Sequence, residues 1–220
     1  MEEINVHVLS EAEIEENKQE FLSLVNSLTI EGVDKEGLIN YLESSDFFTA
    51  PASTKYHAAY YGGLCKHSLN VYKILSNLVS DYGHKCSSQI DQNSIIIAAL
   101  FHDLSKTNFY EASARNVKQY SPNGTKSDNL GKFDWISQES FNIKDASDRM
   151  LYADHGTNSM YLISKYIPLS DEESCAIVNH HAGMDNNMAN RDLTAIYNRY
   201  SLAALLHAAD FIATYIAERI

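Results

Sequence analysis

The 220-residue chain has few cysteines, and their placement excludes two kinds of site. Cys65, Cys86 and Cys175 are an odd number of thiols, and no two of them form a Cys-x-x-Cys pair. This pattern argues against a disulfide framework and against a cysteine-ligated zinc site. We therefore expect three reduced thiols.

Positive charge is also scarce. Lys and Arg together number 17 against 29 Asp and Glu, a formal net charge of −12 with histidine neutral. Such a balance argues against general affinity for nucleic-acid backbones or anionic membranes. A small phosphorylated substrate, such as a nucleotide, is still compatible with it, because bound cations reverse the local field in a pocket. We expect no long nucleic acid and no membrane as partner, and the oligomeric state stays open.

Long apolar runs are missing as well. No run reaches the ~18 residues that a membrane span needs. The first twenty residues are acidic and lack the basic segment followed by an apolar segment that is typical of a leader peptide. We therefore expect a cytoplasmic protein. Hydrophobic residues make up 45% of the chain and charged residues 21%, values typical of soluble globular domains, and the length suits one domain with a real core.

Apolar residues recur at helical spacing along nearly the whole chain, which predicts an all-α fold. Capping boxes predict helix starts at Ser10 and at Ser170. A helix is expected to end at Gly83, and another to begin near Asp91. The last helix is expected to continue unbroken from Leu193 to the final residue.

Residues 108–143 depart from this pattern. Two stretches rich in alternating and aromatic residues flank the turn-rich segment SPNGTKSDNLG. The segment therefore predicts a β-hairpin inserted between helices.

Two carboxylates interrupt segments that are otherwise apolar. Asp103, with His102 before it, follows the apolar run that opens IIIAALFHDLSK, and Asp210 lies within LAALLHAADFIATY. An unpaired charge is heavily penalised in a low-dielectric interior, so both carboxylates need positive partners.

Five histidines and two aspartates are the candidate metal ligands: His67, His102, Asp103, His155, His180, His181 and Asp210. Imidazole and carboxylate together suit Fe, Mn, Co, Ni or Zn, whereas Mg and Ca prefer all-oxygen sites. Seven ligands are too many for one ion and fit two divalent transition-metal ions that share a carboxylate bridge, which we assign to Asp103. Any one histidine taken alone is more often an ordinary core residue.

The order of these residues resembles the HD superfamily of metal-dependent phosphohydrolases, which is named after a His-Asp pair. The resemblance covers about residues 50–215 and includes GGLCKHSLNVY, HDLSK, NHHAG and HAADFIATY. It implies an all-α HD-type helical bundle with the small hairpin as an insertion at about 108–143. The chain would then be one domain over 1–220, with peripheral helices in 1–50 and a metal-binding core in 51–220.

The resemblance also implies a ligand set. Members with only His, His-Asp and Asp are the simplest, and those with further histidines hold two metals. One ion would be held by His67, His102, Asp103 and Asp210. The other would be held by Asp103, His155, His180 and His181.

Three further residues are candidates for contact with substrate. Lys106 lies three residues after Asp103, so the two side chains would share a helix face. Lys106 would then reach a phosphate oxygen or the leaving group. We predict that Asp103 and Lys106 are catalytic. His57 precedes His67 by ten residues and would border the pocket, and Arg191 would add phosphate-binding charge. For each, an ordinary solvated side chain is the alternative.

We expect hydrolysis of a phosphoester, by a phosphomonoesterase or phosphodiesterase that acts on a nucleotide or other small phosphorylated compound. Metal-activated water makes a protein nucleophile unnecessary, in keeping with the lack of Gly-x-Ser-x-Gly and Gly-x-x-x-x-Gly-Lys motifs. The alternatives are a di-iron HD-type oxygenase and a non-catalytic nucleotide sensor. A short single-stranded RNA also stays open as substrate, because related exoribonucleases share the GGL and His-Asp features.

Overall fold

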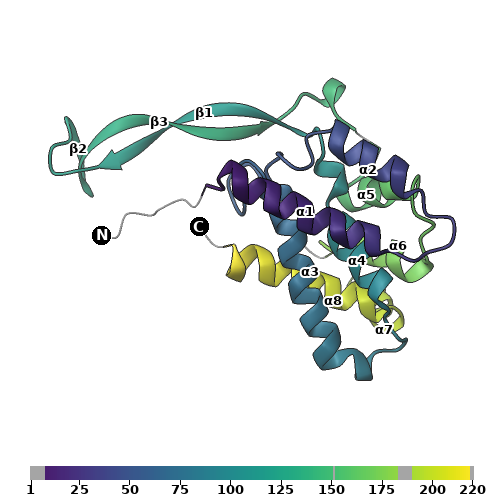
Figure 1. Cartoon of the computed structure of the whole chain (residues 1–220). Coiled ribbons are helices and arrows are strands. Elements are labelled where there is room, and N and C mark those ends of the chain that lie inside the picture. Colours follow the sequence, from purple (N-terminus) through teal and green to yellow (C-terminus); the bar gives the residue numbers. More distant parts are fainter. Residues whose placement is uncertain (1–7, 151, 183–189, 219–220) are drawn as a thin grey trace.

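The computed structural model describes residues 8–150, 152–182 and 190–218, with only the backbone at 190 and 191. Within these residues the chain forms a bundle of eight α-helices and one small sheet (Figure 1). The helices are α1 (Glu11–Ser27), α2 (Lys35–Ser44), α3 (Gly63–Tyr82), α4 (Gln92–Phe101), α5 (His155–Ile163), α6 (Asp171–Val178), α7 (Asn190–Arg199) and α8 (Ser201–Ile212). The strands are β1 (Tyr110–Tyr120), β2 (Lys126–Asp128) and β3 (Gly131–Ile143).

The helix boundaries that local sequence signals predict are confirmed. Complete capping boxes begin α1 at Ser10 and α6 at Ser170, each with the serine hydroxyl accepting from the third helical N–H. The Asp91 carboxylate caps α4 by accepting from the Ser94 N–H, and α3 ends just before Gly83. These signals are local, so they do not depend on how the helices pack.

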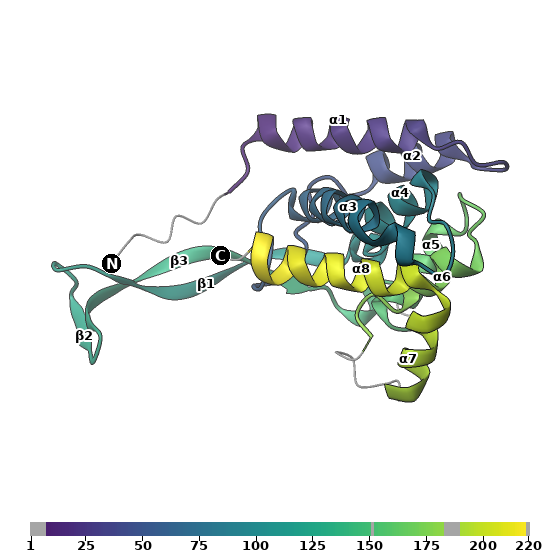
Figure 2. The ribbon, with the colours of Figure 1, turned by 90° about the horizontal axis from the view of Figure 1, so that it is seen from below.

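Helix α4 occupies the centre of the bundle. Every side chain from Ile95 to Phe101 is buried, and the helix belongs to both of the clusters of buried apolar residues. One cluster joins α4 to α1, α2, α3 and α5, and the other joins it to α3, α6 and α8. Helix α1 lies on the outside of the bundle (Figure 2), as expected for a peripheral helix, but its fully buried Phe21 contacts the Phe101 ring.

The predicted insertion is a long antiparallel ribbon that projects from the helices (Figures 1 and 2). Its register runs from Tyr110 opposite Ile143 to Tyr120 opposite Phe133. Strand β2 adds a third strand beside β3, so the strand order is β1-β3-β2. An all-α fold is thus only roughly right. The third strand escaped prediction because its short polar sequence, Lys-Ser-Asp, lies within a segment with turn composition.

The expected unbroken last helix is wrong. At Tyr200 the backbone becomes extended (φ −122°, ψ 91°). The helix axis bends by 106° between α7 and α8. The start of α8 has tertiary partners: the Leu202 N–H donates to Glu172, and the Ser201 hydroxyl accepts from the Ser87 N–H. These contacts outweigh the continuous periodicity. No single described helix is long and apolar enough to cross a bilayer, although this bent pair meets those limits when counted together.

Two glycines at the start of α3 fix the preceding loop. Gly62 has φ +80°, in the left-handed region that side chains disfavour. A Cβ on Gly63 would collide with the carbonyl oxygen of Ala58. The loop therefore packs directly on the helix, and it carries His57 to within 4.7 Å of His67, measured between ring centroids.

We predict that Gly63→Ala lowers the free energy of unfolding by about 1–3 kcal/mol, because backbone atoms have to move to make room. Gly83→Ala is the matched control, since Gly83 has φ −55° and its added Cβ would meet only Val79 at 3.4 Å. That control should leave stability unchanged or raise it by up to about 1 kcal/mol. Urea unfolding of both variants measures the difference, and equal effects would contradict the close approach.

Candidate metal centre

The His-Asp pair lies where α4 ends. His102 is the C-cap of the helix, and Asp103 begins a short 3-10 turn, Leu104–Lys106. This turn is fastened to α5, because the Ser105 N–H donates to the Ser159 hydroxyl at 3.0 Å and the Ser105 hydroxyl donates to the His155 carbonyl at 2.8 Å. The two bonds hold the start of α5, and therefore His155, beside Asp103.

Four predicted ligands from α3, the end of α4 and α8 converge, and we call them the first ligand group: His67, His102, Asp103 and Asp210. The Nε2 atom of His67 lies 3.2 Å from Asp210 Oδ1 and 3.3 Å from His102 Nε2. His102 Nε2 is 3.4 Å from Asp103 Oδ2. All four side chains are buried.

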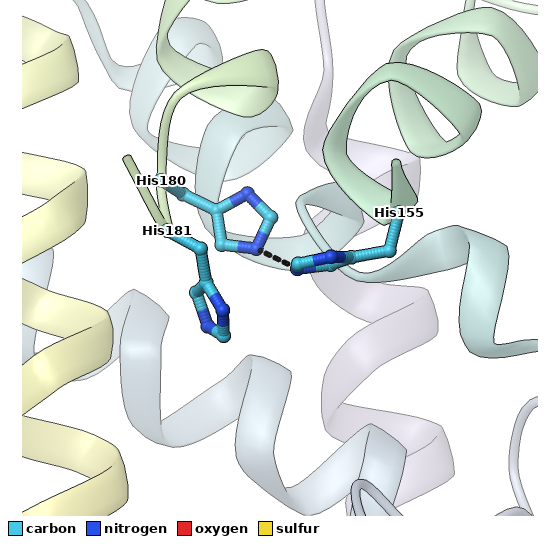
Figure 3. Close-up of side chains that lie close together, drawn as sticks. All are labelled: His155, His180 and His181. Atoms are coloured by element: carbon cyan, nitrogen blue, oxygen red, sulfur yellow. Dashed lines mark hydrogen bonds between the residues drawn. The ribbon is translucent and has the colours of Figure 1, made fainter. Parts of the chain in front are cut away.

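A second ligand group gathers on the other side of Asp103: Asp103, His155, His180 and His181. Figure 3 shows the three imidazoles converging from α5 and the end of α6, with the Nε2 atoms of His155 and His180 3.0 Å apart. Asp103 Oδ1 lies 3.5 Å from His180 Nε2 and 3.8 Å from His155 Nε2. His181 Nε2 is 2.9 Å from Asp210 Oδ2, so it also touches the first group.

Asp103 stands between the two groups and fits the role of a bridge. Its Oδ2 atom faces His67 and His102, whereas its Oδ1 atom faces His155 and His180. The Oδ1 atom is buried and accepts no hydrogen bond from any residue that the structure describes. A buried carboxylate oxygen without a partner is costly, and a cation beside it would remove that cost.

The histidine tautomers leave lone pairs directed into the centre. His102 Nδ1 donates to the Ala99 carbonyl at 2.9 Å, and His180 Nδ1 donates to the Ile177 carbonyl at 2.6 Å. When Nδ1 holds the proton, a neutral ring presents the lone pair of Nε2. These are the atoms that approach Asp103, so the donor set fits a metal that accepts both nitrogen and oxygen.

The protonation states differ among the imidazoles. Burial would lower the pKa of His67, but the Glu218 and Asp210 carboxylates raise it to about 10, so a metal at this ring would have to displace a proton. Burial lowers the pKa of His155 to about 3 and also lowers the pKa of His180, so both rings are neutral at pH 7. Burial by itself would raise the pKa of Asp103, but the Lys106 ammonium and His102 hold that pKa well below its usual range. Neutral imidazole and ionised carboxylate are the metal-binding forms.

Two of the three predicted substrate contacts also reach the centre. Lys106 Nζ lies 2.6 Å from Asp103 Oδ2, and its side chain is only 12% exposed. Burial would lower the pKa of Lys106, but the Asp103 carboxylate raises it above its ordinary value. His57 is buried, and neither of its ring nitrogens has a hydrogen-bond partner within the described part of the chain. The side chain of Arg191 lies outside the described residues.

The sequence did not identify Glu218 as part of this centre. Its carboxylate accepts from His67 Nδ1 at 3.0 Å and from Asn70 Nδ2 at 2.8 Å. In a regular helix Glu218 would point about 80° away from Asp210, eight residues earlier, so periodicity gives no reason to select it. Its one signal is an acidic residue that follows the apolar segment FIATYIA.

One small cavity adjoins the centre, and a larger one lies apart from the candidate ligands. A recess of about 20 Å³ is lined by residues that include His180, His181 and Asp210, with Phe211 and Tyr215 beside them. A larger cavity, about 330 Å³, lies between the loop around Tyr56 and the base of the ribbon. None of the seven predicted ligands lines the larger cavity.

Comparison with known proteins gives one match. The family model for the HD domain matches residues 64–210, which include all five candidate histidine ligands and end on Asp210. No curated protein and no solved structure matches the chain significantly. Because the matched segment covers well over half of the sequence, the chain belongs to the HD-domain family.

Proposed function

We propose that this protein is a metal-dependent phosphohydrolase that acts on a nucleotide or another small phosphoester. The observation that carries the proposal is the unpaired, buried Oδ1 atom of Asp103, which lies between two groups of imidazoles. Family membership supports it at a coarser level, because HD-domain proteins are mostly metal-dependent hydrolases.

In this proposal each ligand group would hold one divalent ion, and Asp103 would be shared by both groups. The mixed nitrogen and oxygen donors favour Fe, Mn, Co, Ni or Zn over Mg or Ca. When bound, such ions would lower the pKa of an attacking water and offset the charge on the phosphoryl oxygens.

The remaining roles fall to side chains that touch the two groups. Lys106, held by Asp103, is placed to donate to a phosphoryl or leaving-group oxygen. The two ring nitrogens of His57, beside His67, have no partner among the residues described, so a substrate oxygen that accepts from His57 would satisfy a buried polar group. The buried surroundings of both residues strengthen such contacts.

One observation favours a second candidate, a di-iron oxygenase. The centre contains five histidines, and imidazole-rich sites also suit iron. Oxygen uptake with turnover, in the absence of released phosphate or nucleoside, would select this candidate over the hydrolase.

We predict that Asp103→Asn lowers phosphoester hydrolysis by more than about 100-fold, because a substitution that removes a bridging charge affects both ions. The assay is a panel of nucleotides, short oligonucleotides and aryl phosphates with Mn, Fe, Co, Ni or Mg. Asp81→Asn, at an exposed position on α3, is the matched control and should keep full activity. Unchanged activity in Asp103→Asn would remove the proposed bridge.

We predict that the metal ions raise thermal stability. At concentrations about 100-fold above the dissociation constant, binding to the native state adds about 2.7 kcal/mol per site, enough to raise Tm by about 5–10 °C. Scanning calorimetry of chelator-treated protein, before and after Mn or Co is added, measures the shift. Asp103→Asn should lose most of the shift and Asp81→Asn none of it.

We predict that Lys106→Ala lowers kcat by about 100-fold, as expected when one donor to developing charge is lost. His57→Ala should raise KM by about tenfold, the loss of roughly one buried hydrogen bond. Both variants should retain the wild-type metal content, measured by elemental analysis, because neither residue belongs to a ligand group. A variant that loses its metal instead would contradict the assigned role.

A further inference from the structure

The C-terminal end of α8 has an unusual turn. After Ile212 the helix widens into a π turn over Ala213–Ala217, and the Glu218 N–H donates to the Ala213 carbonyl five residues earlier, at 2.9 Å. A π turn holds more residues than an α turn and is often found at functional sites. The extra residue brings Glu218 round to the face of the helix that carries Asp210, from which a regular helix would turn it about 80° away.

This turn buries a carboxylate against the first ligand group. The Glu218 side chain is 4% exposed, and that of His67 is 0% exposed. Glu218 Oε2 accepts from His67 Nδ1, and Glu218 Oε1 accepts from Asn70 Nδ2. His67 and Asn70 are one turn apart on α3, so the carboxylate is held by two donors on the same helix face.

The acceptor for His67 differs from those of the neighbouring imidazoles. His102 and His180 donate their Nδ1 protons to backbone carbonyls three residues earlier, in their own helical turns. His67 donates to a charged group from a distant segment of the chain. A carboxylate acceptor fixes the ring and makes its other nitrogen a stronger ligand than a neutral acceptor does.

We propose that Glu218 is the positioning residue for His67 at the first ligand group, and that Asn70 holds the Glu218 carboxylate in place. Glu218 holds a proton on His67 Nδ1, so Nε2 is the nitrogen that faces His102, Asp103 and Asp210 and would bind a metal there. The π turn is the backbone feature that makes this contact possible. The inference rests on the proposed metal centre and does not depend on which substrate the centre hydrolyses.

The experiment measures metal binding by the full chain, with no substrate present. Wild type and the Glu218→Ala, Glu218→Gln and Asn70→Ala variants are stripped with chelator and titrated with Co²⁺ against a competing chelator. The titration gives two dissociation constants and the visible absorption of each bound ion. Ile216→Ala is the matched control, because Ile216 belongs to the same π turn and is 69% exposed. Proton NMR of the metal-free proteins monitors the His67 Nδ1–H resonance.

We expect Glu218→Ala to weaken one of the two ions by about 10- to 100-fold and to leave the other unchanged. Glu218→Gln should weaken the same ion less, because its amide oxygen still accepts from Nδ1. Asn70→Ala should also have a smaller effect, and Ile216→Ala none. The downfield Nδ1–H resonance should disappear only in Glu218→Ala, and the absorption of the affected ion should change in both Glu218 variants.

Four results would overturn the inference, three of them in the variants and one in the wild-type protein. Wild-type affinity for both ions in Glu218→Ala would show that Glu218 only ties the C-terminal turn to α3. An equal loss in Ile216→Ala would assign the effect to general loosening of that turn. A third bound ion that disappears in Glu218→Ala would make Glu218 a ligand, since His57, His67 and Glu218 also lie close enough to hold one. A wild-type protein that binds two ions but hydrolyses no phosphoester would refute only the proposed function, whereas one that binds no ion would refute both proposals.

Discussion

Two buried carboxylates, Asp103 and Asp210, set the constraint on which the rest of the structure depends. Each is almost fully removed from water and surrounded by imidazoles from several helices, and the Lys106 ammonium of the adjoining turn also lies beside Asp103. Ionised carboxylates in such surroundings are tolerated when they have close positive partners. The fold supplies those partners by directing α3, α5, α6 and α8 toward the end of α4.

The arrangement follows from the character of α4. Because the helix is apolar on all sides, it is buried centrally, and its C-terminal end can deliver a polar pair only into the interior. The chain leaves the helical path at this point, and the short 3-10 turn separates the two oxygens of Asp103 toward different histidine groups. Ser105 then links the turn to α5, which couples the main core to the second ligand group.

Much of this was predictable from the sequence. The caps at Ser10, Asp91 and Ser170 mark helix starts through local chemistry, and the alternation in 108–143 predicts the ribbon. The seven candidate ligands were selected because polar residues at inward-facing positions need partners, and the resemblance to the HD superfamily supported the set. The structure brings all seven side chains together. The break at Tyr200 could not be predicted, because it depends on partners from Ser87 and Glu172 that lie far away in the sequence. Glu218 was missed for a related reason, since only the π turn directs it inward.

The central claim is that Asp103 bridges two metal ions, and anomalous X-ray diffraction from crystals grown with Mn²⁺ or Fe²⁺ tests it most directly. The account predicts two anomalous peaks about 3.5–4 Å apart, one beside each oxygen of the Asp103 carboxylate. A single peak that does not touch Asp103 would contradict the account. The absence of any peak, with Lys106 as the only cation beside this carboxylate, would also contradict it.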